Sequence, residues 1–316
     1  MSRGYDRDER IDDRNQGLRT EQATTPGRLR ETVGRTDGNS RKPARDRAER
    51  GPKRARETSN DARENKRLNM RALEKWYGLS ERERGTLREI GRFRTIDADA
   101  LSKYRYAGKP AAFRKEIARL QQQELLKRRS ISVGKNRDTL IIVALTKQGA
   151  RLVRQDHQLA ETQAIYAGFV KPAEVPHDAA IYQMYQTEAR EIEAKGGKIR
   201  RVVLDYELKK EVYSKLVRER EAGALEYARR QQEIAEEQRL PIVDGKIALP
   251  DLRIEYERPE GDLDHVDLEL ATEHYHRGHM AVKTRAGFKM YGFVSTSRGR
   301  RAQWEGRELT ATVLSL

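Results

Sequence analysis

The first 68 residues constrain the fold most, because they carry almost no apolar side chains. Within them, the stretch RKPARDRAERGPKRARETSNDAREN interleaves Arg with Asp, Glu, Gly and Pro. Such a segment cannot bury enough apolar surface to offset the entropy lost on ordering it. We therefore expect residues 1–68 to be a disordered basic tail, which either holds DNA phosphates loosely or is simply solvated. Any hydrophobic core must be built from the residues that follow.

The charge of the whole chain indicates the kind of partner. Its 316 residues include 65 Lys plus Arg against 50 Asp plus Glu, a formal net charge of +15. This excess predicts a polyanionic partner, with nucleic acid ahead of an anionic membrane surface. The lack of cysteine excludes disulfides and thiolate zinc sites. No apolar run approaches the roughly 20 residues of a membrane span, and residues 1–25 lack the apolar stretch of a signal peptide. We expect a cytoplasmic protein that does not enter membranes.

Residues 69–156 have the pattern of a small DNA-binding domain. SERERGTLREIGRF begins with Ser80, and Glu83 three residues later fits a capping box. DADALSKY and KPAAFRKEIARLQQQELL predict two more helices, and KRRSISV and TLIIVAL predict a β-hairpin around the turn GKNRD. Three helices followed by a hairpin are typical of a winged helix-turn-helix domain, so we predict that fold here.

The third predicted helix would enter the major groove of double-stranded DNA. Its inner face holds Phe113, Ile117, Leu120 and Glu124. The tip of the hairpin would reach a neighbouring phosphate or the minor groove. The predicted DNA contacts on the helix and the tip are Arg114, Lys115, Arg119, Gln122, Lys135 and Arg137. A module for protein contacts is the alternative, but the charge on the outward face favours DNA.

Residues 157–176 read as a linker punctuated by prolines, and residues 177–316 as a second, mixed α and β domain. Its predicted elements are a helix from residue 177, a strand from residue 198, a charged helical insertion at 207–238, strands at 246–257 and 265–271, and a helix at 273–290. The chain as a whole is therefore predicted to be α+β.

The strand HVDLELA carries an acidic face. Because successive side chains of a strand point to opposite sides, Asp267, Glu269 and Ala271 share one face and the Val and Leu residues share the other. Asp251 lies on the preceding predicted strand, so pairing of the two strands would bring three carboxylates together. Such groups repel one another unless a proton or cation intervenes. We predict that Asp251, Asp267 and Glu269 bind Mg²⁺ or Mn²⁺ for phosphodiester cleavage.

The order of helix, strand, strand with Pro-Asp, strand with acid-x-acid and helix resembles the restriction-endonuclease-like α-β-β-β-α core of the PD-(D/E)XK nucleases. The resemblance matches Asp251 with the Pro-Asp acid and Asp267 with the third-strand acid. Glu269 then stands where the family has a lysine that orients the attacking water. Alternatively, Glu269 matches the third-strand acid and Ala271 occupies the lysine position.

Some members of that superfamily carry the lysine on the next helix. The resemblance then implies Lys283 or Lys289 as the catalytic lysine. The upstream acid would be Glu188, or Glu207 at the end of the first strand. Tyr291 is either a nucleophile toward DNA or, more commonly, a packed ring with its hydroxyl at the rim.

A broader similarity covers most of residues 80–292. The segments LTKQG, HDAAIYQMY, LDYE, LPDLRIE and VDLELATE, followed by a Lys-rich helix, resemble the plasmid replication-relaxation family. This resemblance implies a protein of a plasmid or conjugative element that nicks or relaxes DNA in replication or transfer. Its endonuclease activity would depend on metal.

A non-catalytic alternative stays open. The nuclease-like domain would then be degenerate and serve dimerisation, or it would recruit a relaxase or replication partner, while the winged helix acts as regulator or origin binder. The acids would be solvated or paired with Arg253 or Arg285. His177 would be a packing residue or a phosphate contact. The histidines His265, His274, His276 and His279 crowd the same region, where zinc or a surface role is compatible with their spacing.

Overall fold

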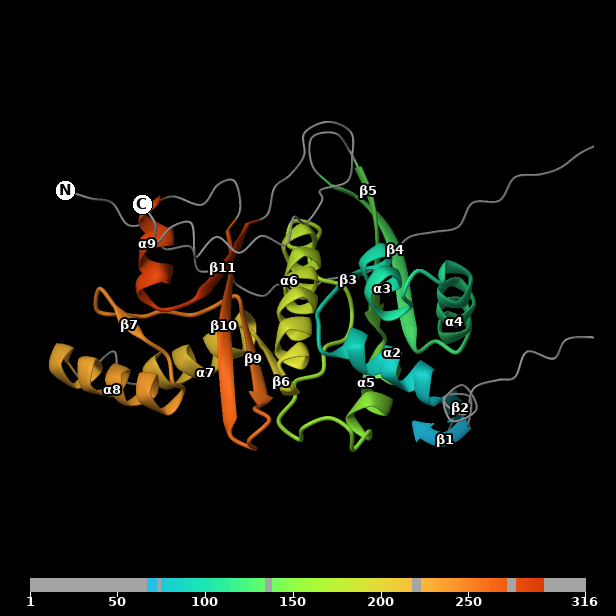
Figure 1. The fold of residues 1–316 in the computed structure, drawn as a ribbon, viewed down its shortest axis with the longest axis horizontal. Coiled ribbons are helices and arrows are strands. Elements are labelled where there is room, and N and C mark those ends of the chain that lie inside the picture. The colour runs from blue at the N-terminus through green and yellow to red at the C-terminus, as the bar shows by residue number, and fades with distance from the viewer. Residues whose placement is uncertain (1–66, 73–74, 134–137, 218–222, 272–276, 293–316) are drawn as a thin grey trace, which may run out of the picture. The chain divides into compact units, whose positions relative to one another are not determined.

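The computed structural model describes residues 67–72, 75–133, 138–217, 223–271 and 277–292, all within one compact unit of the chain, Arg56–Leu316. These residues form a mixed α+β fold, as predicted (Figure 1). The predicted tail lies outside them, except for Arg67 and Leu68. Among the described helices, each is too short or too polar to cross a lipid bilayer.

The first module combines the four helices α2 to α5, a small sheet and an additional hairpin (Figure 1). Its elements are β1 (Arg67–Ala72), β2 (Lys75–Ser80), α2 (Glu81–Gly91), β3 (Ile96–Asp97), α3 (Ala98–Arg105), α4 (Pro110–Gln122), β4 (Leu126–Val133), β5 (Asp138–Leu145) and α5 (Lys147–Arg154). The predicted capping box is confirmed: the Ser80 side chain accepts from Glu83 N, and Glu83 accepts from Ser80 N. Strands β3, β5 and β4 form an antiparallel sheet in that order.

The β1–β2 hairpin was not predicted. It pairs Arg67 with Ser80 and continues to Ala72 and Lys75, so a described strand includes the last two residues of the segment assigned to the tail. Tyr77 and Leu79 are almost wholly buried. The alternation of these two apolar residues along the strand is the sequence signal for this hairpin. The alternating run is too short to identify a strand next to a long charged segment.

Glu124, the acidic residue predicted on the inner face of α4, does not lie there. Ile117 and Leu120 are buried, but Glu124 lies beyond the helix, exposed and with a φ of 59°. The buried acid is instead Glu116, whose carboxylate accepts hydrogen bonds from the Tyr106 hydroxyl at 2.6 Å and from Thr86 and Arg82. Three donors compensate the burial of this charge.

The second module is built on a four-stranded sheet. Its elements are α6 (Val175–Ala194), β6 (Lys198–Leu204), α7 (Asp205–Leu216), α8 (Ala224–Glu237), β7 (Ile242–Val243), β8 (Lys246–Ile247), β9 (Leu252–Glu257), β10 (Leu263–Ala271), α9 (Arg277–Arg285) and β11 (Lys289–Gly292). The sheet order is β11-β10-β9-β6, with β9 antiparallel to both neighbours and β11 parallel to β10. The predicted insertion is helical, and α7 and α8 share a small core of their own.

Three predicted boundaries were wrong. The strand expected at 246–257 is two strands separated by residues 248–251. The last helix ends at Arg285 rather than 290, because Gly287 adopts a φ of 78° and turns the chain into β11. The strand from residue 198 ends at Leu204, so Glu207 lies in α7.

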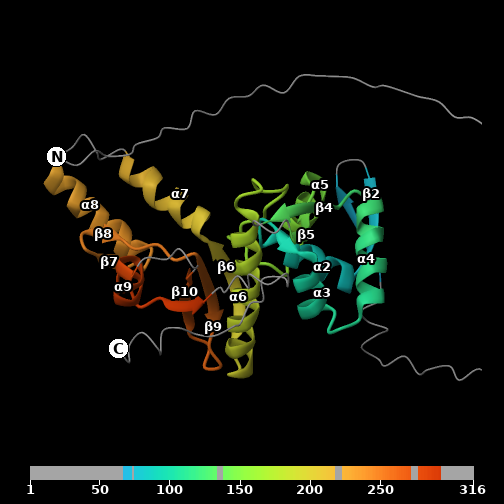
Figure 2. The same ribbon diagram turned by 90° about the horizontal axis from the view of Figure 1, so that it is seen from above.

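The two modules pack directly on each other where the segment that follows α2 meets α6. The Phe93 ring lies 5.1 Å from Tyr182 and 5.0 Å from Tyr185, measured between ring centroids. The predicted linker is also bonded to both modules: Tyr166 N donates to Gly91 O at 2.9 Å, and the Gln163 amide exchanges two hydrogen bonds with the backbone of Val202. These contacts hold α6 beside the first module (Figure 2).

Candidate functional site

Two of the three predicted metal-binding acids meet at one end of the sheet. The β9–β10 ladder ends at the pair Leu252 and Leu268, so Asp251 stands opposite Glu269. Glu269 Oε2 accepts from Asp251 N at 3.2 Å, and Asp251 Oδ2 accepts from Leu270 N at 2.9 Å. These bonds hold both carboxylates against the strand ends.

The predicted lysine on the last helix reaches the same place. Lys283 Nζ lies 2.9 Å from Glu269 Oε1 and donates to Leu249 O at 2.6 Å. The Glu269 side chain is only 3% exposed, whereas that of Lys283 is 21% exposed. Asp251, Glu269 and Lys283 therefore form one cluster, assembled from the loop before β9, from β10 and from α9.

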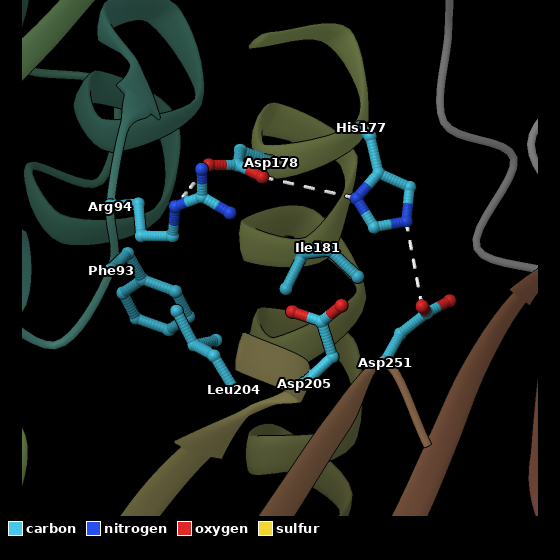
Figure 3. Close-up of a pocket in the computed structure, with 8 residues that line it drawn as sticks. All are labelled: Phe93, Arg94, His177, Asp178, Ile181, Leu204, Asp205 and Asp251. Atoms are coloured by element: carbon cyan, nitrogen blue, oxygen red, sulfur yellow. Dashed lines mark ion pairs between the residues drawn. The ribbon is translucent and has the colours of Figure 1, made fainter. Parts of the chain in front are cut away.

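His177, in the first turn of α6, extends this cluster toward the first module. Its Nε2 lies 3.6 Å from Asp251 Oδ1, and its Nδ1 lies 3.9 Å from Asp178 Oδ1 (Figure 3). The ring stands between the two carboxylates, with 39% of the side chain exposed. The sequence is compatible with either a packing role or a phosphate contact for His177, and its proximity to Asp251 places it in this cluster.

The charges in the cluster stabilise one another. Burial lowers the pKa of His177, but Asp178 and Asp251 raise it more, to about 10. Burial likewise raises the pKa of Asp251, but His177, the Leu270 N–H and Lys283 together hold it below its ordinary value. At neutral pH the site therefore presents an ionised carboxylate beside a protonated imidazole.

A small pocket opens beside this cluster, between the modules (Figure 3). It is lined by Phe93, Arg94, His177, Asp178, Ile181, Leu204, Asp205 and Asp251. Arg94 comes from the first module and lies with its Nε 3.6 Å from Asp178 Oδ2. The first module thus contributes a cation to the edge of the site.

Asp267 does not join the other two acids. The Arg253 guanidinium binds both oxygens of Asp267, at 2.7 and 2.8 Å, and also donates to Gln238 O and Arg239 O. Both side chains are nearly buried. Within the described ranges, no three His, Asp or Glu side chains are arranged to hold a metal ion. The three predicted acids therefore do not converge on one point, because Arg253 is the direct cross-strand partner of Asp267.

The other predicted catalytic residues lie elsewhere. Glu207 is bound by Arg201 and, at 3.4 Å, by the Tyr166 hydroxyl. Lys289 lies 2.8 Å from Glu188, to which the Tyr291 hydroxyl donates at 2.5 Å.

The strand register explains why the Lys289 pair is separate from the cluster. Lys289 and Tyr291 pair with Leu268 and Leu270, so they share the face that packs on α6 and not the face of Glu269. Tyr291 is 1% exposed, and burial together with Glu188 raises its pKa. Its geometry fits packing rather than nucleophilic attack.

The predicted DNA-contact residues of α4 divide into two groups. Arg114, Lys115 and Gln122 are exposed on the outward face. Arg119 is half-buried, with its Nη1 3.2 Å from Glu83 Oε1. The hairpin-tip residues Lys135 and Arg137 lie outside the described residues, as do His274 and His276. Of the four histidines predicted to crowd this region, two are described: His265 Nε2 lies 3.9 Å from Asp267, and His279 is exposed on α9.

No protein-family model, curated protein or solved structure matches this chain.

Proposed function

We propose that this is a DNA-binding protein of a plasmid or conjugative element that nicks or relaxes DNA with the help of Mg²⁺ or Mn²⁺. The first module would be a winged helix-turn-helix domain and the second a PD-(D/E)XK-like nuclease domain. The observation that carries the proposal is the convergence of Asp251, Glu269 and Lys283. It corresponds to the reading in which Glu269 is the third-strand acid and the lysine stands on the following helix.

The two carboxylates fit a hard divalent cation. Mg²⁺ is usually bound through one or two carboxylates, with water and substrate phosphate completing its coordination. Asp251 and Glu269 would hold the ion, which supplies Lewis-acid polarisation of the phosphodiester when bound. Asp267 would instead fix the strand through Arg253.

The cations around the site would act on the DNA. Lys283 is held 2.9 Å from Glu269, and its ammonium would stabilise negative charge that develops on the phosphate in the transition state. His177 and Arg94 stand at the edge of the site that faces the first module. Both would contact the phosphates of DNA that runs from one module to the other.

The outward face of α4 supports duplex binding. Arg114, Lys115 and Gln122 are exposed there, with Ala111 and Ala118 between them. Small residues permit close approach to the base edges, while Lys and Arg neutralise phosphates and Gln reads adenine. The chain's net charge of +15 would increase the rate of association with DNA.

The decisive experiment is a nicking assay on supercoiled plasmid carrying the element's own origin or transfer region. We expect wild-type protein with Mn²⁺ or Mg²⁺ to produce open circles and excess chelator to prevent this. Asp251→Asn should bind the DNA but not cut it. Asp244→Asn is the matched control, because Asp244 is 61% exposed and pairs only with exposed Arg285 among the contacts described. Cutting by Asp251→Asn at the wild-type rate would contradict the proposed site.

A second function is favoured by the internal pairing of the acids. Lys283 and Arg253 already neutralise Glu269 and Asp267, which suits a domain that has lost catalysis. The protein would then be a DNA-binding accessory that dimerises or recruits a relaxase or replication partner. Wild-type protein that binds the DNA tightly but leaves it uncut with every divalent metal would support this function over the first.

A further inference from the structure

The β1–β2 hairpin turns an aromatic side chain out into solvent. Tyr77 and Leu79 point into the core of the first module. Because side chains alternate along β2, Trp76 points outward, and 64% of its surface is exposed. A single exposed apolar residue is ordinary on a protein surface. The neighbours of Trp76, however, are not ordinary surface residues.

The outward face of this hairpin carries a row of polar groups beside the ring. Arg71 pairs with Trp76 across the strands, and its guanidinium lies 5.9 Å from the ring centroid. Farther along, Asn69 pairs with Gly78, and Arg67 Nη1 donates to Gly78 O at 2.7 Å. Because Gly78 has no side chain, the surface next to the ring stays low.

This face adjoins the proposed DNA-binding helix. The buried carboxylate of Glu83 lies 3.8 Å from Arg67 on the hairpin and 3.2 Å from Arg119 on α4. The outward row of the hairpin therefore continues the basic surface of α4 rather than standing apart from it.

The combination of a flat ring, guanidinium groups and an amide matches the chemistry of unpaired nucleotides. Bases stack on aromatic side chains with little regard to sequence, and basic groups follow the backbone. In a duplex the faces of the bases are already stacked, so an exposed tryptophan gains this contact only where strands have separated. A protein that nicks supercoiled DNA meets such strands at its site of action.

We propose that the outward face of the β1–β2 hairpin binds single-stranded DNA, with a base stacked on Trp76 and phosphates held by Arg67 and Arg71. This inference rests on the proposed function, because it adds a single-strand contact to the duplex contact of α4. It also predicts that the protein binds DNA with both a paired and an unpaired segment more tightly than either alone.

The tryptophan provides its own probe. The chain has two tryptophans, Trp76 and Trp304, so full-length Trp304→Phe protein reports on Trp76 alone. We expect an oligothymidine to quench this fluorescence, as stacking requires. Trp76→Ala should weaken oligothymidine binding roughly ten-fold in fluorescence anisotropy, and Trp76→Tyr should recover most of the loss. Tyr213→Ala removes another half-exposed aromatic ring, on α7, and should leave the affinity unchanged.

The outcomes separate this inference from the proposed function. If Trp76→Ala binds oligothymidine as well as wild type, or if quenching is absent, the hairpin proposal is overturned. Duplex binding and metal-dependent nicking by the same preparation would then leave the proposed function standing. Protein that binds oligothymidine through Trp76 but never cuts plasmid would support the hairpin site while contradicting nicking.

Discussion

The ammonium group of Lys283 lies 2.9 Å from the buried carboxylate of Glu269, although helix α9 and strand β10 present them from separate elements. This pair joins a lysine and an acid that are not neighbours in the sequence. The packing of α9 against the end of β10 therefore brings together two groups that no local pattern of the sequence would pair.

Replacing Lys283 tests whether this cation takes part in cleavage. We expect Lys283→Met to lower the nicking rate roughly a hundred-fold, the usual cost of removing one group that stabilises transition-state charge. Lys283→Arg should retain part of the activity, and DNA affinity should change little. Arg285→Ala, on the same helix but paired with exposed Asp244, is the control. Equal losses in both variants would show that α9 itself, and not the ammonium group, is responsible.

Removing Arg253 should destabilise the second module. Arg253→Met leaves the nearly buried Asp267 carboxylate without its cation and frees two backbone carbonyls. We expect the free energy of unfolding in urea to fall by about 3–5 kcal/mol. The double variant Arg253→Met/Asp267→Leu should recover much of this loss. If the single variant is as stable as wild type, the pair contributes nothing to the fold.

Acid should weaken the contact between the modules through Glu89. Its carboxylate accepts from the Tyr182 hydroxyl at 3.2 Å and from the Gln186 amide at 2.5 Å. Burial alone would raise the pKa of Glu89, but Arg92 and the other donors hold it below its ordinary value of 4.5. A carboxyl group with a lowered folded-state pKa contributes stability above its unfolded pKa, and this stability is lost as the pH falls through the folded value.

We therefore expect Glu89→Gln to lower the free energy of unfolding by about 1–3 kcal/mol at pH 7. At pH 3 the difference between variant and wild type should be smaller. Urea titrations at the two pH values measure both quantities. A loss that does not depend on pH would mean that the shape of the side chain, rather than its charge, matters at this contact.

Reversing the charge of Lys115 tests the proposed recognition face. Lys115 is exposed on α4, so Lys115→Glu should fold normally but bind duplex DNA more weakly. The slope of log affinity against log salt should shrink by about 1 for the lost phosphate contact. Lys195→Glu makes the same charge change at an exposed position after α6. An identical effect of the two variants would indicate only a general loss of positive charge.

Local rules of sequence determined several elements of this protein correctly. The capping box of Ser80 and Glu83 starts α2 as predicted, because capping needs only backbone and side chains within one turn. The alternation in β10 likewise buries Leu268 and Leu270 against α6 and sets Glu269 on the opposite face. A period of two fixes faces wherever one side of a sheet is buried.

Only the tertiary structure decided which of these groups meet. Strand alternation predicts that Asp267 and Glu269 share one face. The cross-strand register pairs Asp267 with Arg253. Glu269 instead contacts Asp251 and Lys283. Register and the path of the α9 crossover depend on contacts between residues distant in the chain, which local patterns do not encode. Strand faces and helix starts are local consequences of the sequence, whereas the partner of each buried charge is set by how the strands and helices pack.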